Sequence, residues 1–146
     1  MTLISVPVWC DEWNLQASEK AQFVIIDAGI LEEKMKQHIK ETGIEPAMFW
    51  LGRREGIQQF YNAFNAFLLY SRYGELPVVG LENQICGSPM FFSTAVTLEA
   101  SAWDLGHFIN LDDDSSALAE KIIPVVEKNI PIRISHAKAM TDAKNN

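Results

Sequence analysis

The sequence is poor in cysteine and in basic residues, and each shortage excludes a class of protein. Only two of its 146 residues are cysteine, Cys10 and Cys86, which is too few for a disulfide scaffold. Basic residues are also scarce, with 12 Lys and Arg against 19 Asp and Glu and a net charge of −7. Because binding to nucleic-acid phosphates needs clustered Lys and Arg, we expect no nucleic-acid partner. No apolar run is long enough to span a bilayer, so we expect no membrane partner.

Targeting and linker signals are lacking as well. The first residues carry no basic segment ahead of an apolar one, unlike a signal peptide, so we predict a cytoplasmic protein. Hydrophobic residues make up 48% of the chain, which is enough for a core. We find no repeat or linker and predict one globular domain over residues 1–136, followed by a polar, frayed tail over residues 137–146. The sequence leaves open whether Cys10 and Cys86 are free.

Short motifs for common chemistries are missing too. There is no Gly-rich dinucleotide loop, no Walker loop, no G-x-S-x-G, and no His or Cys pair at metal-ligand spacing. The acids at 112–114 lack the alternation and the glycine of a calcium loop. We therefore predict no cofactor, no metal and no catalytic residue. The sequence leaves open whether the protein is an enzyme. The absence of these motifs favours a protein without catalytic activity.

Apolar periodicity predicts the secondary structure. Alternating or short apolar runs predict strands at 3–9, 47–51, 76–81, 89–100 and 130–134, the first at a sheet edge because of Pro7. Helical spacing predicts helices over 18–42 and 53–73, the second with Phe64 buried, and a third that starts near Ser115. The run Phe23–Ile26 also fits a buried strand, so residues 18–42 are either one helix or a strand followed by a helix.

The order of these elements predicts the fold class. The strands at 76–81 and 89–100 follow each other directly, which favours an antiparallel hairpin. We therefore predict an α+β fold, with a mixed, largely antiparallel sheet of about five strands and two or three helices packed on it. The alternative is a three-layer α/β fold with a parallel sheet. Against this alternative, no Gly-rich turn follows the first strand.

Two arginines form the first candidate site. Arg53 and Arg54 stand where the helix over 53–73 is predicted to begin, at an end that already carries positive partial charge. This arrangement predicts an anion subsite made of both side chains and the free N–H groups of the first turn, with Trp50 as a flat wall. The alternative is that both arginines pair with acidic residues of the same chain.

Aromatic residues form the second candidate site and suggest two functions. They are expected to line either a pocket or a protein interface: Tyr61, Tyr70, Phe91, Trp103 and Trp13. An interface favours a protein-interaction domain, which could be an inhibitor, an immunity-type protein or a regulatory partner. It could also join two copies of the chain in a homodimer through the helix over 53–73. The pocket favours a small-ligand-binding domain or an enzyme that uses the arginine pair to bind an anion.

Overall fold

The fold is built on one parallel sheet. The computed structural model describes residues 2–6, 22–26, 29–69, 71 and 77–144. These residues contain six strands: β1 (Thr2–Val6), β2 (Gln22–Ile25), β3 (Met48–Trp50), β4 (Ala66–Leu69), β5 (Met90–Ser93) and β6 (Gly106–Ile109). The strand order is β3-β2-β1-β4-β5-β6. Each neighbouring pair is parallel, so every connection between described strands crosses from one end of the sheet to the other.

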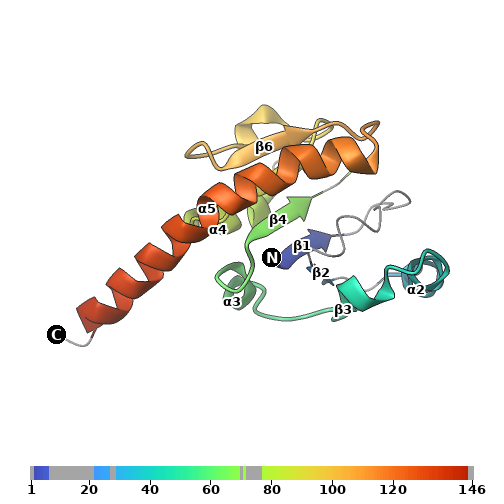
Figure 1. The fold of residues 1–146 in the computed structure, drawn as a ribbon, viewed down its shortest axis with the longest axis horizontal. Coiled ribbons are helices and arrows are strands. Elements are labelled where there is room, and N and C mark those ends of the chain that lie inside the picture. Colours follow the sequence, from blue (N-terminus) through green and yellow to red (C-terminus); the bar gives the residue numbers. More distant parts are fainter. Residues whose placement is uncertain (1, 7–21, 27–28, 70, 72–76, 145–146) are drawn as a thin grey trace.

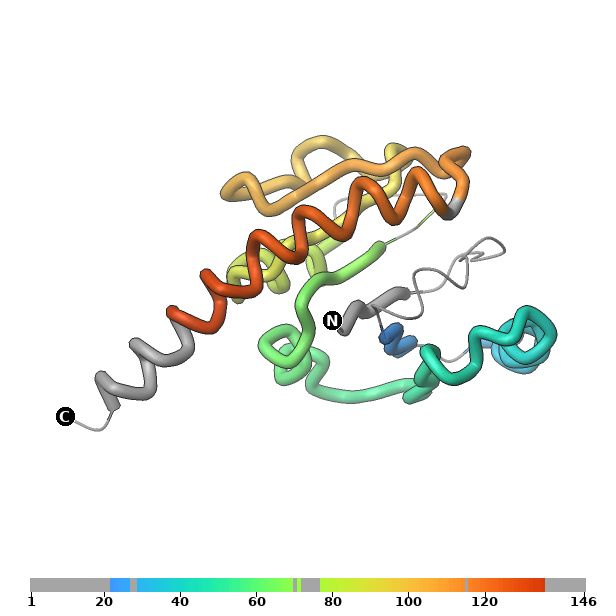
Figure 2. The backbone as a smooth tube through the Cα atoms, viewed as in Figure 1, coloured from blue at the N-terminus to red at the C-terminus, as the bar shows by residue number. Residues whose placement is uncertain are grey.

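Helices cover both faces of this sheet (Figure 1). They are α2 (Glu32–Glu41), α3 (Gln58–Tyr61), α4 (Val78–Ile85) and α5 (Ser115–Lys144), with short 3-10 helices at Glu45–Ala47 and Leu98–Ala100. Figure 2 traces the chain from α2 and β3 on one side of the molecule, through β4, to β6 and α5 on the other side. The arrangement is a three-layer α/β fold, as expected for a parallel sheet whose faces must both be buried.

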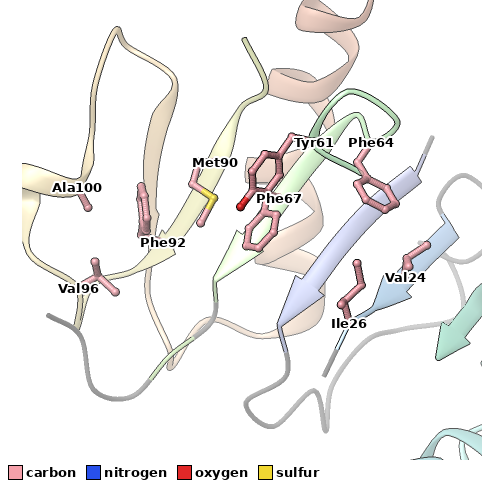
Figure 3. Close-up of a cluster of buried hydrophobic side chains, with 9 residues drawn as sticks. All are labelled: Val24, Ile26, Tyr61, Phe64, Phe67, Met90, Phe92, Val96 and Ala100. Carbon is pink, nitrogen blue, oxygen red and sulfur yellow. The ribbon is translucent and has the colours of Figure 1, made fainter. Parts of the chain in front are cut away.

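Alternate side chains of the strands feed hydrophobic clusters on the two faces. Under α5, Phe91 of β5 packs with Leu118 and Ile122. On the same face, Ile25 packs with Ile39 of α2. The opposite face holds the larger cluster, in which Tyr61 of α3, Phe67 of β4 and Met90 of β5 lie together (Figure 3).

The predicted fold class is therefore wrong, and its alternative is closer to the structure. The predicted hairpin fails because residues 78–81 are helical: α4 occupies Val78–Ile85 and carries the chain back to start β5 parallel to β4. The edge position predicted for the first strand is also wrong, since β1 pairs with both β2 and β4. Pro7, which prompted that prediction, lies outside the described residues.

Two further predicted elements differ from the structure, and one open alternative is resolved. The helix predicted over 53–73 is instead the short α3 followed by β4, although Phe64 is buried as expected. Within 18–42, the second reading holds, with strand β2 followed by α2. The strand predicted at 130–134 is part of α5, which continues through Pro124 and Pro131 and into the predicted tail, to Lys144. The homodimer prediction, which rested on a helix over 53–73, stays a prediction.

Several predicted elements are confirmed. Strands lie at Thr2–Val6 and Met48–Trp50, within or next to the predicted ranges 3–9 and 47–51. The last helix starts at Ser115, as the acids before it indicated. Asp114 caps this helix, because its Oδ1 accepts a hydrogen bond from the backbone N–H of Ala117 at 2.9 Å. The single-domain prediction stays a prediction.

Candidate functional site at the carboxyl edge of the sheet

The strand order reverses between β1 and β4. From β1 the chain builds outward through β2 and β3, and it then returns to add β4 on the other side of β1. In open parallel sheets, ligands bind outside the carboxyl ends of the strands at such a reversal, because the two connections leave in opposite directions. Here those ends are Val6 and Leu69. The topology therefore identifies this edge of the sheet as the candidate site.

The loop after β5 supplies described residues to this edge. Ser93 Oγ, at the end of β5, donates a hydrogen bond to the backbone carbonyl oxygen of Ser71, which follows β4. The backbone N–H of Thr94 donates to the carbonyl oxygen of Ile109 at 2.9 Å. These bonds fix the base of the loop, while Thr94 and Ala95 are exposed. The sequence does not reveal this loop. Residues 89–100 are predicted as one strand because no Gly or Pro marks the turn after Ser93.

Arg53 and Arg54 lie at the same edge of the sheet. They follow the carboxyl end of β3, and both are exposed. Their loop is bracketed by Gly52 at φ 67° and Gly56 at φ 70°, left-handed conformations that favour glycine. The predicted helix start is wrong, since α3 begins at Gln58. Three strand spacings, about 14 Å, separate β3 from β4, so the arginines stand to one side of the reversal.

Trp50 packs against α2. Its ring lies 5.7 Å from Lys36 Nζ, within the range of a cation–π contact. It also packs against the cluster of Ile25 and Ile39. The indole Nε1 is buried and has no hydrogen-bond partner among the described residues. Trp50 is thus mainly part of the packing between β3 and α2.

The predicted aromatic site is not assembled. Tyr61 and Phe91 lie in clusters on opposite faces of the sheet, so the sheet itself separates them. Trp103 is 68% exposed in the turn that leads into the amino end of β6. Tyr70 and Trp13 lie outside the described residues. The described members of this set therefore form no common pocket.

Two buried titratable side chains lie away from this edge. Burial, together with a 2.9 Å hydrogen bond from its hydroxyl to Glu82 Oε2, raises the pKa of Tyr61 well above its ordinary value. Burial lowers the pKa of His107, whose ring centroid lies 5.3 Å from that of Phe91. Tyr61 packs within the core and the half-buried His107 packs against Phe91, and we assign neither a role in the site.

The chain matches the family described as "Glycosyl transferases group 1" over residues 13–145. It belongs to this family. The predicted protein-interaction domain is therefore wrong as the main function, and the enzyme alternative is closer. Within the described ranges, no group of three His, Cys, Asp or Glu side chains could hold a metal ion. No helix in the same ranges is long and apolar enough to cross a membrane.

Curated relatives of this chain are much longer than the chain itself. The Vi polysaccharide biosynthesis protein VipC/TviE of Salmonella typhi is 28% identical over 81 residues, which are 56% of this chain and 14% of that protein. EpsF of Bacillus subtilis (strain 168) is 27% identical over 113 residues, which are 77% of this chain and 29% of that protein. The chain thus spans less than a third of either relative.

Two solved structures share the fold. Anabaena Alr3699/HepE in complex with UDP-glucose superimposes with a TM-score of 0.69 at 18% identity, covering 95% of this chain and 43% of that one. WaaG, a glycosyltransferase involved in lipopolysaccharide biosynthesis, gives a TM-score of 0.70 at 14% identity, with coverage of 94% and 40%. The likeness supports the parallel Rossmann-like α/β fold. It spans less than half of each solved chain.

Proposed function

We propose that this glycosyltransferase chain binds a nucleotide-sugar donor of the UDP-sugar class at the carboxyl edge of its sheet. The observation that carries the proposal is the reversal of strand order between β1 and β4, the place where parallel sheets bind such ligands. The similar chain of HepE was solved with UDP-glucose, which supports the choice of donor. The cytoplasmic location predicted from the sequence is part of this proposal, since it is where we expect the donor to be available.

The reaction would transfer the sugar to an acceptor hydroxyl. The bond between the anomeric carbon and the diphosphate oxygen breaks, and the acceptor oxygen bonds to that carbon. The nucleoside diphosphate leaves with the bonding electron pair, and the acceptor proton passes to a base. Negative charge therefore grows on the leaving group, and fixed N–H donors or cations beside it stabilise the transition state. We assign no catalytic side chain among the described residues.

We further propose that Arg53 and Arg54 contact the anionic part of the donor or of the acceptor. Both are exposed at the edge that carries the site. A guanidinium binds phosphate or carboxylate oxygens through paired N–H groups, so exposed arginines at this edge suit a charged substrate. This keeps the anion subsite expected from the sequence but moves it from a helix start to a strand end.

Titration calorimetry with UDP-glucose, UDP and glucose tests the proposal. We expect saturable binding of UDP-glucose and UDP, and no measurable binding of glucose alone, because the diphosphate and the base supply most of the contacts. Replacing Arg53 and Arg54 with Gln should weaken UDP binding about tenfold, as for the loss of roughly 1.4 kcal/mol of charge-assisted hydrogen bonding. The matched control is Lys40→Gln with Lys128→Gln, which removes the same charge from exposed positions on α2 and α5.

The outcomes separate the two parts of the proposal. If neither UDP nor UDP-glucose binds, the proposed function is wrong. If both bind but the arginine and lysine double variants weaken binding equally, the arginines act only through net charge and the anion subsite is wrong.

A further inference from the structure

One segment of the chain combines strong negative charge with exposed apolar side chains. Residues 77–120 contain no Lys or Arg. They contain seven acids: Glu82, Glu99, Asp104, Asp112, Asp113, Asp114 and Glu120. This segment thus carries a charge of −7, as much as the net charge of the whole chain. It comprises α4, β5, β6 and the start of α5, all of which the structure describes.

Four large apolar side chains of this segment are exposed. Val78 and Ile85 on α4 are 66% and 69% exposed, and Leu98 and Trp103 are 77% and 68% exposed. Val78 and Ile85 are seven residues apart, so they share one face of α4 and lie about 10 Å apart along its axis. We call these four residues the α4–Trp103 surface.

Gln84 ties the parts of this surface together. This buried side chain donates a hydrogen bond from Nε2 to the carbonyl oxygen of Ala100 at 2.7 Å. Its Oε1 accepts a hydrogen bond from the backbone N–H of Ala102, also at 2.7 Å. Ile85 and Trp103 are the next residues after Gln84 and Ala102, so both belong to segments held against each other. The segments that carry Ile85, Leu98 and Trp103 therefore lie side by side.

Trp103 has a left-handed backbone conformation, which residues with large side chains rarely adopt. Trp103 and Asp104 have φ angles of 53° and 56°, and the N–H of Leu105 donates to the carbonyl oxygen of Ala102 at 3.0 Å. This is a tight turn that favours Asn or Gly at both central positions. The turn thus accepts backbone strain and places a large indole in water. Packing among the described residues gives no reason for a tryptophan at this position.

We propose that the α4–Trp103 surface binds a basic amphipathic helix of a partner protein. Exposed Trp and branched apolar side chains are typical anchors of protein interfaces. Glu99 and Asp104, both exposed beside these anchors, attract Lys and Arg on the rim of a partner. The same charge disfavours an anionic membrane, and it disfavours a second copy of this chain bound through the same surface. The surface is additional to the proposed donor site and does not depend on it.

Fluorescence anisotropy with labelled synthetic peptides tests this proposal on the full chain. The probe is a peptide of Leu and Lys arranged to form an amphipathic helix of about 18 residues, long enough to be helical when bound. A peptide of the same composition in scrambled order and an analogue with Glu for Lys are the comparisons. We expect the first peptide to bind at least about tenfold more tightly than the scrambled one, with an affinity that falls as salt rises. The Glu analogue should not bind.

Substitutions within the surface make the test specific. Trp103→Asn and Leu98→Ser should each weaken binding of the amphipathic peptide at least about tenfold, as for the loss of an interface anchor. Because Asn tolerates the left-handed conformation, Trp103→Asn should not lower the melting temperature, and it should leave UDP binding unchanged. Phe49→Ser is the control. Phe49 is 45% exposed on β3, the outermost strand on the side of the sheet away from β6.

Three results would overturn the proposal. Equal affinity for the ordered and scrambled peptides would reduce the binding to charge alone. Equal weakening by Phe49→Ser and Trp103→Asn would show that the surface is not the binding site. Sedimentation that shows a dimer of the parent chain and a monomer of Trp103→Asn would identify the occupant as a second copy.

Discussion

Nη2 of Arg133 donates a hydrogen bond to the backbone carbonyl oxygen of Tyr61 at 2.8 Å, across 72 positions of the sequence. Nη1 of the same guanidinium donates to the carbonyl oxygen of Phe64 and, at 3.2 Å, to Ser88 Oγ. Burial lowers the pKa of Arg133, although an arginine remains charged at neutral pH. Arg133 therefore fastens α5 to the connection between α3 and β4.

Removing this guanidinium should destabilise the chain. Arg133→Met keeps much of the apolar stem but leaves the carbonyl groups of Tyr61 and Phe64 without their donor, which should cost about 2–4 kcal/mol of unfolding free energy. Urea unfolding followed by circular dichroism measures the difference. Lys128→Met, at an exposed position on the same helix, should change the stability by less than about 0.5 kcal/mol. Similar losses in both variants would mean that Arg133 contributes only through charge.

The buried hydroxyl of Tyr61 should make stability depend on alkaline pH. Its pKa is raised in the folded chain by burial and by Glu82, so the folded state holds this proton more tightly than the unfolded state does. The resulting stability is present in full below the unfolded pKa of about 10 and is lost as pH rises from there toward the folded pKa. Between the unfolded and the folded pKa the loss approaches about 1.4 kcal/mol per pH unit, and above the folded pKa it levels off.

Tyr61→Phe isolates this effect. The variant should lose about 1–2 kcal/mol at pH 7, through the missing hydrogen bond to Glu82, but it should lose less stability than the parent between neutral pH and pH values above about 10. Glu82→Gln keeps an acceptor and removes the charge, so its pH dependence should fall between the two. Chemical unfolding at a series of pH values provides the comparison. Parallel curves for the parent and Tyr61→Phe would contradict the assignment.

Gly80 is required by the close approach of α4 to the sheet. A Cβ atom at this position would lie 2.7 Å from Cε1 of Phe92, a ring that is itself fully buried. Gly80→Ala should therefore destabilise the chain by about 1–3 kcal/mol, although alanine favours a helix by roughly 1 kcal/mol. Gly29→Ala is the matched control, because its Cβ would meet nothing within 4 Å. Thermal melts should show a lower melting temperature for Gly80→Ala only.

The parallel topology could not be predicted from the apolar pattern because several buried elements have no clear period. Ala66–Leu69 is apolar throughout, as is typical of a strand buried on both faces, and with Phe60 and Phe64 before it the run also fits a helix. Val78–Ile85 shows the opposite case. It reads as a strand up to Leu81, yet it is a helix with Gly80 packed on Phe92. The strand β4 was thus predicted as part of a helix, and the start of α4 was predicted as a strand. As a result, a hairpin was predicted where the chain makes a crossover connection.

The site was only partly predictable for a related reason. Arg53 and Arg54 were identified from their unusual charge, and the structure places them at the carboxyl edge of the sheet, to one side of the reversal. The predicted pocket combined Tyr61 with Phe91, which a sheet separates, because the sequence does not show on which face a side chain lies until the strands are known. The absence of a Gly-rich turn counted against a parallel sheet, but that turn reflects one way of binding a dinucleotide and is not required by the fold.

The most direct test of the proposed function asks which edge of the sheet binds the nucleotide. Ala95, after β5, and Ala63, before β4, are both exposed and lie at opposite edges. Each is replaced with Trp, and UDP binding is measured by titration calorimetry. A large side chain at the carboxyl edge should weaken UDP binding at least about tenfold, while the same side chain at the amino edge should leave it unchanged. Unchanged binding to Ala95→Trp together with weakened binding to Ala63→Trp would contradict a donor site at the carboxyl edge.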